Sequence, residues 1–328
     1  MSRVDGWEVS LSHPLVLPFL RWPGGKRWLP FHLVNLLAGV RFNRYFEPFL
    51  GGGAVFFALQ PARSLLSDIN GDLIKTYRQV RSCPRMLEER LGAMKSDRAT
   101  YDTVRADAPT SALDSAVRFL YLNRTGFAGI YRTNRRGEFN VPYGGGMRTA
   151  AVLSESQLLR KASAPLRSAG LRIADFEDIL DSAEGGDLVY CDPTYSVVHN
   201  DNGFVRYNEP IFSWADQRRL AAAAFRARRR GATVIVSNAD HSSVTELYRS
   251  STRIRFVRKS RLCPESSHRR LTSEAVFIIA PSRVRKGLSV RSDKAPSGEP
   301  YGVTLQRNPS RADPEHWVGI GVKRSDRR

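Results

Sequence analysis

Asp192, Pro193 and Tyr195 belong to a short motif, Asp-Pro-Thr-Tyr, whose chemical groups can bind an amino group. The motif follows the apolar run 187–191, which predicts a strand. Ligands of open α/β sheets bind at the carboxyl ends of strands. An ionised carboxylate only accepts hydrogen bonds, the proline carbonyl is a second acceptor, and a tyrosine ring can stack. This set suits an exocyclic amino group, although Asp-Pro alone also fits a strand that ends in an Asx turn.

A glycine-rich turn earlier in the chain is typical of nucleotide sites. Segment 46–57 reads Phe-Glu-Pro-Phe-Leu-Gly-Gly-Gly-Ala-Val-Phe-Phe, so Gly51 and Gly53 permit a sharp turn between a strand and a helix. Asp68 ends the next predicted strand, where a carboxylate can accept hydrogen bonds from both hydroxyls of a ribose. The glycines alone fit any tight turn, but the combination predicts a nucleotide site. Their spacing differs from G-x-G-x-x-G, which disfavours a nicotinamide cofactor.

Segment 21–26, Arg-Trp-Pro-Gly-Gly-Lys, combines an aromatic face, a glycine turn and a lysine. These groups are compatible with a ligand site near the N-terminus. Taken by itself, the segment is better explained as a surface loop with a buried tryptophan.

Arginines and aromatic residues alternate through segment 118–144. Residues 118–148 contain six arginines and one glutamate, a local charge of +5. Arginine can bind guanine with two hydrogen bonds, and aromatic side chains can stack on bases or wedge between them. A generic solvated loop would rarely carry so many rings, so the segment predicts contact with nucleic acid.

The elements that must position these motifs alternate between strands and helices. Strands are predicted at 45–49, 64–67, 171–174, 187–191, 233–237 and 275–279, with helices between them at 54–60 and 214–230. This alternation favours a largely parallel α/β sheet. The stretch 71–150, helical at 114–123, interrupts the rhythm and is interpreted as an inserted subdomain. The body then comprises 1–70 and 151–281, and 282–328 is interpreted as a flexible basic tail.

Composition narrows the class of protein. The 328 residues carry a formal charge of +19, of which the tail from residue 281 contributes +6, and this charge favours a polyanionic partner. An apolar content of 41% excludes a wholly disordered chain, and no apolar run is long enough to span a bilayer. Three widely spaced cysteines and the lack of a recognisable signal peptide favour a reducing, cytoplasmic location. We expect no metal.

Taken in order, the four segments resemble the D12 class of DNA adenine-N6 methyltransferases, the Dam-like enzymes. The similarity covers roughly residues 17–280, and its most specific part is the segment NRTGFAGIYRTNRRGEFNVPYG. The resemblance implies a Rossmann-like domain that uses S-adenosylmethionine. It also implies that the insert 71–150 is a helical and hairpin domain that recognises the DNA target.

The resemblance also assigns roles to single residues. Asp68 corresponds to the carboxylate at the cofactor ribose, and Asp175 and Phe176 resemble the pair beside the cofactor adenine. The remaining cofactor positions are Trp22, Lys26, Glu47, Phe49, Gly51, Gly53 and Asp192. Arg132 matches the arginine that reads a guanine, and Phe127 the aromatic side chain inserted at the target. The further DNA-binding residues are Arg124, Asn134, Arg135, Arg136 and Tyr207, and the loop that packs near the base includes Phe204, Tyr207 and Phe212.

We expect the reaction to take place on an adenine flipped out of duplex DNA, because N6 inside a duplex cannot reach a buried methyl donor. Asp192 and the Pro193 carbonyl would accept the two N6 hydrogens, and Tyr195 would stack on the extruded ring. Thr194 replaces the usual second proline of the motif, and Ala128 stands where Dam has asparagine. The target sequence therefore stays open.

Two alternatives remain at this point: a catalytically silent DNA-binding relative, and an N4-cytosine methyltransferase. Duplex DNA is the expected partner of a monomeric chain, and a cognate restriction endonuclease is a candidate second partner. RNA is disfavoured because the insert resembles a reader of duplex DNA.

Overall fold

The structure, a computed structural model, describes residues 7–9, 16–22, 26, 28–134, 136–145, 149–196, 212–259 and 271–285. These residues form two compact units. The first contains the described residues up to Ser182 together with Gly186–Leu188. The second contains Ala183–Gly185 and the described residues from Val189 onward.

The first unit is built on three parallel strands in the order β5-β4-β3. Their bounds are Tyr45–Glu47 for β3, Ser64–Asp68 for β4 and Ala169–Ile173 for β5. The helices that accompany them are α1 (Leu29–Leu37), α2 (Ala54–Leu59), α3 (Gly71–Ser82) and α9 (Phe176–Asp181). A short antiparallel ladder joins β1 (Trp7–Glu8) to β2 (Arg41–Phe42). The register pairs Asp68 with Ile173, so the ends of β4 and β5 lie side by side.

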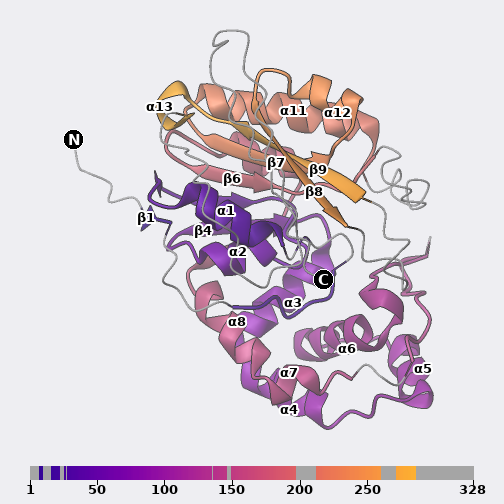
Figure 1. The fold of residues 1–328 in the computed structure, drawn as a ribbon. Coiled ribbons are helices and arrows are strands. Elements are labelled where there is room, and N and C mark those ends of the chain that lie inside the picture. The colour runs from indigo at the N-terminus through magenta and orange to yellow at the C-terminus, as the bar shows by residue number, and fades with distance from the viewer. Residues whose placement is uncertain are drawn as a thin grey trace, which may run out of the picture. The chain divides into compact units, whose positions relative to one another are not determined.

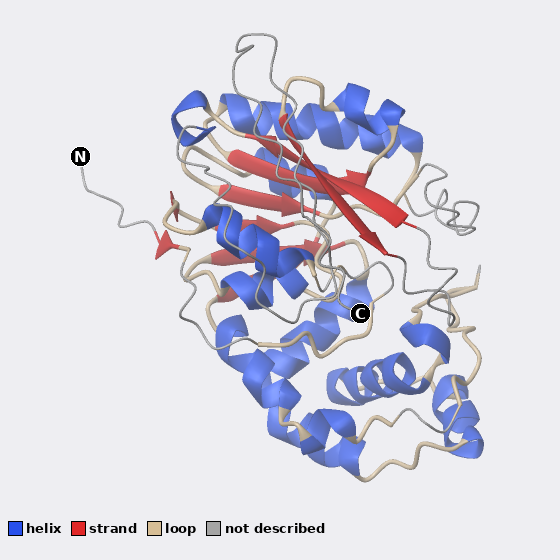
Figure 2. Cartoon of the chain, viewed as in Figure 1, coloured by secondary structure: helices blue, strands red, loops and turns tan. Residues whose placement is uncertain are grey.

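A group of helices in the same unit contains no strand among its described residues (Figure 2). It comprises α4 (Pro84–Gly92), α5 (Arg98–Ala106), α6 (Ala112–Thr125), η1 (Phe127–Gly129), α7 (Val152–Glu155) and α8 (Leu158–Leu166). The central helix α6 packs against α3, α4 and α5, and it buries Leu120 and Tyr121 completely. The helix predicted at 114–123 is confirmed within α6.

The described residues of the second unit include β7, β8, β9 and all of β6 except its first residue, Leu188, in the order β6-β7-β9-β8 (Figure 1). They are β6 (Leu188–Cys191), β7 (Thr233–Ala239), β8 (Thr252–Lys259) and β9 (Leu271–Ile279), with β9 antiparallel to both β7 and β8. Helix α11 (Trp214–Arg229) packs on β7 and β9, and α12 (Ser242–Leu247) and α13 (Ser282–Arg285) complete the unit. Ser213 and Asp216 form a capping box that starts α11.

The predicted α/β fold is confirmed, and all six predicted strand positions carry strands. The sequence analysis missed β8, whose arginines conceal its buried residues Ile254 and Phe256. Most of the predicted tail lies outside the described residues. Within the described part of the chain, no helix is both long and apolar enough to cross a membrane.

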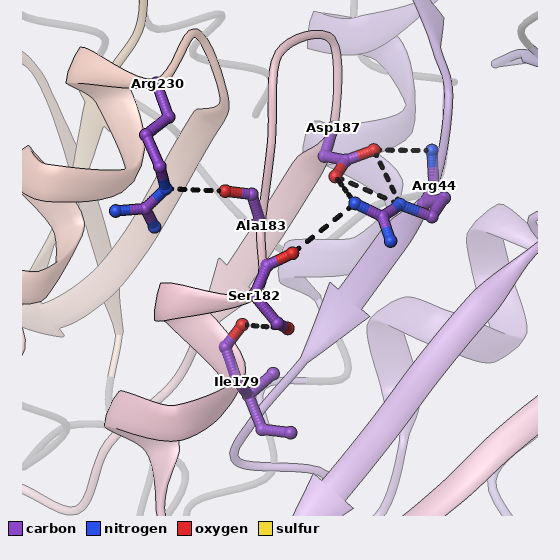
Figure 3. Close-up of polar contacts among 6 residues, drawn as sticks. All are labelled: Arg44, Ile179, Ser182, Ala183, Asp187 and Arg230. Atoms are coloured by element: carbon purple, nitrogen blue, oxygen red, sulfur yellow. Dashed lines mark hydrogen bonds and ion pairs between the residues drawn. The ribbon is translucent and has the colours of Figure 1, made fainter.

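The segment before β6 is held by an ion pair between the buried Asp187 and the partly exposed Arg44 (Figure 3). The Arg44 guanidinium contacts both oxygens of Asp187, with Nε 3.1 Å and Nη2 2.6 Å from Oδ2, and the Arg44 amide donates to Oδ1. Arg44 also donates to the Ser182 carbonyl. In the second unit, Arg230 Nε donates to the Ala183 carbonyl at 2.9 Å. The contacts of Arg44 compensate the charge of Asp187, which is almost fully buried.

Candidate functional site

The glycine turn lies between β3 and α2, in a conformation that favours glycine. Gly51 and Gly53 have φ values of +45° and +65°, and Gly53 is the N-cap of α2. The Tyr77 hydroxyl donates to the Gly51 carbonyl at 3.0 Å, and a Cβ on Gly53 would lie 2.9 Å from that hydroxyl. The turn therefore has neither the backbone geometry nor the space for larger residues at these two positions.

Trp22 covers the outside of this turn. A Cβ on Gly51 would lie 2.7 Å from Cδ1 of the Trp22 indole, so the two residues are in close contact. The indole also stacks on Tyr131 and Phe119, at ring-centre distances of 6.2 and 6.5 Å. Trp22 thus connects the glycine turn to α6 and to the segment that precedes Arg132. Lys26, from the same N-terminal segment, is buried.

Asp68 ties the end of β4 to the glycine turn. Its Oδ2 accepts from the Gly51 amide and its Oδ1 from the Asn70 amide, both at 3.0 Å. Burial raises the pKa of Asp68 above 3.8, and the hydrogen bonds from these amides partly oppose the shift. Two carboxylate oxygens offer about four acceptor positions, so lone pairs remain for further donors.

Glu47 is buried at the end of β3, beneath the same turn. Its Oε2 accepts from the Tyr45 hydroxyl at 2.7 Å and from the Phe56 amide in the first turn of α2 at 3.1 Å. A carboxylate at a helix N-terminus satisfies amides that have no helical partner. Burial, together with the charges of Glu47 and Asp68, raises the pKa of Tyr77 well above 10. Tyr77 therefore remains a neutral hydrogen-bond donor to the turn.

Phe49 and Phe176 stack with ring centres 5.3 Å apart, at an interplanar angle of 22°. Asp175 precedes Phe176 as the N-cap of α9, where its Oδ1 accepts from the Glu177 amide at 2.9 Å. The structure thus brings two predicted cofactor residues into direct contact. Ile69, next to Asp68, is more than two-thirds exposed, and it adds apolar surface at the end of β4.

Asn123 is a buried residue near the end of α6 that the sequence analysis did not single out. Its side chain accepts from the Arg21 amide at 2.9 Å, and it donates to the carbonyls of Arg21 and Gly129. Gly129 has a positive φ, and a Cβ there would lie 2.5 Å from the Arg21 Cβ. This clamp fixes the backbone next to Trp22. In the sequence, these contacts are indicated only by an asparagine that directly follows the apolar run 119–122.

Arg132 opens a hairpin-like turn whose sides pair at Thr133 and Phe139. Its Nε donates to the Asn140 side chain at 2.8 Å, and the Arg132 side chain is exposed. Asn134 organises the turn itself, because its Oδ1 accepts from the amides of Arg136 and Glu138. The arginine is therefore held on an exposed turn with a fixed backbone.

The other arginines of the segment differ in their surroundings. Arg118 donates to the carbonyls of Val104 and Arg105 at the end of α5, and Arg124 donates to the Phe19 carbonyl. Arg136 is exposed. Phe127 is 57% exposed, which is unusual for a phenylalanine. Arg135, Phe204 and Tyr207 lie outside the described residues.

Asp192 lies directly after β6, as predicted. Its Oδ1 accepts from the Ser237 hydroxyl on β7 at 2.7 Å, and the Ser237 oxygen accepts from the Tyr190 hydroxyl at 3.2 Å. Pro193 is buried, and Asp192 is partly exposed. One oxygen of the Asp192 carboxylate thus accepts from the Ser237 hydroxyl, which in turn accepts from the Tyr190 hydroxyl.

The residues after Asp192 are held by other side chains of the second unit. The Tyr195 hydroxyl donates to Oε2 of the buried Glu274 on β9 at 3.0 Å. Gln217 of α11 is fully buried, and its Nε2 lies 3.4 Å from the Thr194 carbonyl and 3.4 Å from the Ser196 hydroxyl. Asn238 donates to Gln217 Oε1 at 2.9 Å. The sequence analysis did not identify Gln217 or the contact of Ser237.

The first unit thus has a glycine turn with a strand-end aspartate, the second has an Asp-Pro motif after a strand, and the fold is of the α/β class that many nucleotide-binding enzymes share. A family model for the D12 class N6 adenine-specific DNA methyltransferases matches residues 22–261. The chain belongs to this family. It is an adenine-specific DNA methyltransferase, as the resemblance implied.

Several curated relatives support this assignment. The type II methyltransferase M1.LlaDCHI of Lactococcus lactis subsp. cremoris is 34% identical over 71% of this chain and 84% of its own length. The DNA adenine methylase of Haemophilus influenzae is 31% identical over 81% of this chain and 94% of its own length. The retron Ec67 DNA adenine methylase of Escherichia coli is 33% identical over 81% and 91% of the two chains.

Proposed function

We propose that this enzyme transfers a methyl group from S-adenosylmethionine to N6 of an adenine flipped out of duplex DNA, with Asp192 as the principal acceptor. The observation that carries the proposal is the placement of Asp192. It ends β6 with one oxygen engaged by Ser237, and it is partly exposed. An ionised carboxylate has about four acceptor positions, so one that is held in this way can also accept from an amino group.

The residues of the first unit fit the cofactor. The glycine turn has positive φ values and bears no side chains of its own at Gly51 and Gly53, a backbone that a ligand can approach closely. Asp68 retains acceptor capacity for ribose hydroxyls, and Phe49 and Phe176 form an aromatic pair suited to a purine. The expected contacts of Trp22, Lys26, Glu47 and Asp175 belong to this part of the proposal. When bound, S-adenosylmethionine supplies an electrophilic methyl group on a sulfonium.

The chain's own residues would handle the adenine. Asp192 and the Pro193 carbonyl would accept hydrogen bonds from the two N6 hydrogens, which leaves the nitrogen lone pair directed away from the ring plane. Tyr195 would stack on the base. As N6 gained the methyl group, the cofactor would leave as the neutral thioether, and N6 would lose one proton, for which the Asp192 carboxylate is an acceptor. Catalysis would then arise from orientation and preorganised acceptors. Thr194 is compatible with this role because Gln217 binds its carbonyl, which restrains the loop without a second proline ring.

DNA would be read by the turn that carries Arg132. An arginine can bind O6 and N7 of guanine together, and Asn140 already orients the Arg132 guanidinium. The exposed ring of Phe127 can wedge beside the target, and Arg136 can contact phosphates. Arg124 and Asn134 form hydrogen bonds with the protein's own backbone, and they would stabilise the segment that carries these DNA-contacting residues.

The remaining expectations extend the same proposal. Residues 1–70 and 151–281 would form the catalytic domain, 71–150 the target-recognition domain and 282–328 a basic tail. The enzyme would act as a cytoplasmic monomer on the cell's own duplex DNA. A cognate restriction endonuclease is proposed as a partner because relatives carry the name type II methyltransferase.

A methyl-transfer assay on unmethylated DNA tests the role of Asp192. Asp192→Ala should abolish transfer of labelled methyl groups from S-adenosylmethionine, while calorimetry still detects cofactor binding. Glu246→Gln is the matched control, because Glu246 is an exposed carboxylate of the same unit that pairs only with Arg249 among the described residues. Transfer by Asp192→Ala at the wild-type rate would refute the proposal.

A further inference from the structure

Ser237 occupies a position in β7 where a hydroxyl is costly unless it is hydrogen-bonded. The residue is 1% exposed, and every residue of β7 is buried. Its hydroxyl donates to Asp192 Oδ1 at 2.7 Å and accepts from the Tyr190 hydroxyl at 3.2 Å. Because Tyr190 donates to the Ser237 oxygen, the hydroxyl hydrogen of Ser237 remains available for Asp192. The order of donors thus runs from Tyr190 through Ser237 to Asp192.

This contact restrains rotation of the Asp192 carboxylate about its last bond. The terminal torsion of aspartate is broad, so a carboxylate on a short side chain rotates readily about its last bond. A hydroxyl that holds Oδ1 fixes the plane of the carboxylate and with it the direction of Oδ2. Orientation of this kind matters for an acceptor that must bind a base in one geometry.

The backbone around Asp192 is held by different residues. Gln217 binds the Thr194 carbonyl, and Glu274 binds the Tyr195 hydroxyl. Neither contact involves Ser237. Loss of the Ser237 hydroxyl should therefore remove one restraint on the Asp192 carboxylate and leave the path of the loop in place.

We propose that Ser237 is a positioning residue for the methyl transfer, which aims Asp192 Oδ2 at the amino group of the adenine. The inference rests on the proposed role of Asp192. Ser237 touches neither the base nor the cofactor in this account, and it acts only through the carboxylate. Tyr190 has the subordinate role of orienting the Ser237 hydroxyl.

The test compares Ser237→Ala, Ser237→Cys and Ser237→Thr with wild-type enzyme on unmethylated plasmid DNA. The alanine and cysteine variants should lose about 10- to 100-fold in kcat, the size of effect that misplacement of a catalytic group produces. Values of KM for DNA and cofactor, and the cofactor affinity measured by calorimetry, should stay unchanged. Ser237→Thr retains the hydroxyl, so it should recover most of kcat.

Further variants distinguish loss of the Tyr190–Ser237–Asp192 hydrogen bonds from loss of buried hydroxyl groups in general. Tyr190→Phe should reduce kcat by about two- to tenfold, the effect of one neutral hydrogen bond. Tyr248→Phe is its control, because Tyr248 is equally buried and its hydroxyl has no partner among the described residues. Ser163→Ala controls for Ser237→Ala, since Ser163 is a buried serine that donates to the Arg81 carbonyl in the first unit. Both controls should keep wild-type kcat.

Three results would overturn the inference. They are wild-type kcat in folded Ser237→Ala, a loss of kcat matched by equal losses of DNA or cofactor affinity, and a folded Ser237→Thr that binds both ligands yet is as slow as alanine. The Asp192→Ala variant separates this inference from the proposed function. If Asp192→Ala is inactive and Ser237→Ala is fully active, only the positioning role fails. If Asp192→Ala is active, the proposed mechanism itself fails.

Discussion

The indole of Trp22 lies against Gly51 so closely that a single added methyl group at the glycine would come within 2.7 Å of Cδ1 and 2.9 Å of Nε1. The indole cannot easily retreat, because its ring is stacked on Tyr131 and Phe119. The N-terminal segment, the glycine turn and α6 are therefore packed as one block within the first unit. A change at Gly51 must move either the turn or this aromatic stack.

Gly51→Ala should weaken binding of S-adenosylmethionine by about tenfold or more, because the left-handed backbone alone disfavours alanine by about 1–2 kcal/mol and the clash displaces the turn. Calorimetric titration of the folded variant measures the effect. Gly39→Ala is the control, since Gly39 has φ +78° but a methyl group added there would meet no atom within 4 Å. It should lose stability and keep cofactor affinity. Equal affinities for Gly51→Ala and wild type would remove the glycine turn from the cofactor site.

Cofactor affinity should depend on pH through Asp68. Burial raises the pKa of Asp68, so its carboxylate takes up a proton at a higher pH than the ordinary value of 3.8. Protonation removes a charged acceptor for the ribose hydroxyls, so affinity should be full above the raised pKa and should fall as pH falls through it. Calorimetry at a series of pH values at which the enzyme stays folded provides the measurement. Asp68→Asn should bind weakly at every pH, and an unchanged pH dependence in this variant would assign the effect to another group.

Much of this arrangement was predictable because local patterns carry it. The strand before Asp192 is a continuous apolar run, and the glycine turn is followed by an aspartate at the end of the next strand, a combination that predicts a nucleotide site. Strand β8 carried a weaker signal, because Arg253 and Arg255 alternate with its buried residues. Both arginines pair with Asp240 on the loop after β7. Burial acts to raise the pKa of Asp240, but hydrogen bonds from Ser273, Arg255 and Arg253 hold it below its usual value. In sequence, a strand with arginines on one face resembles a solvent-exposed segment, because the aspartate that pairs with them lies elsewhere in the chain.

Ala128 should be a site where asparagine stabilises the enzyme. This exposed residue adopts φ +55° and ψ 7°, a left-handed conformation that asparagine tolerates better than alanine. Ala128→Asn should raise the free energy of unfolding by about 0.5–1 kcal/mol in urea titrations. The same change in an exposed helical position, Ala99→Asn in α5, should lower it by about 0.5 kcal/mol. Shifts of the same sign at both positions would contradict the backbone argument.

Arg132→Ala should relax the choice of target sequence. Loss of a bidentate contact to guanine costs about 1–3 kcal/mol of discrimination, so methylation should spread to sites that differ at one base pair. Sequencing of methylated adenines in DNA from an expressing strain measures this spread. Arg249→Ala, which removes an exposed arginine paired with Glu246 in the other unit, should leave the target unchanged. An unchanged target for Arg132→Ala would assign the reading of guanine to another residue.

The supporting contacts could not be predicted, because single polar residues produce no local pattern. Ser237 follows Asp192 by 45 residues, and only the pairing of strands brings its hydroxyl to the carboxylate. The positive charge of the insert likewise does not indicate which of its arginines are exposed. Its arginines look equivalent in sequence, yet Arg118 and Arg124 bind backbone carbonyls while Arg132 and Arg136 are exposed. Partial burial and hydrogen bonds to distant backbone carbonyls, which composition does not reveal, distinguish Arg118 and Arg124 from the exposed arginines.

Nucleoside analysis of DNA after incubation with the enzyme and S-adenosylmethionine tests the central claim most directly. The account predicts N6-methyladenine from wild-type enzyme and none from Asp192→Ala, with the cofactor still bound by both. N4-methylcytosine as the product, or N6-methyladenine at wild-type levels from Asp192→Ala, would contradict it.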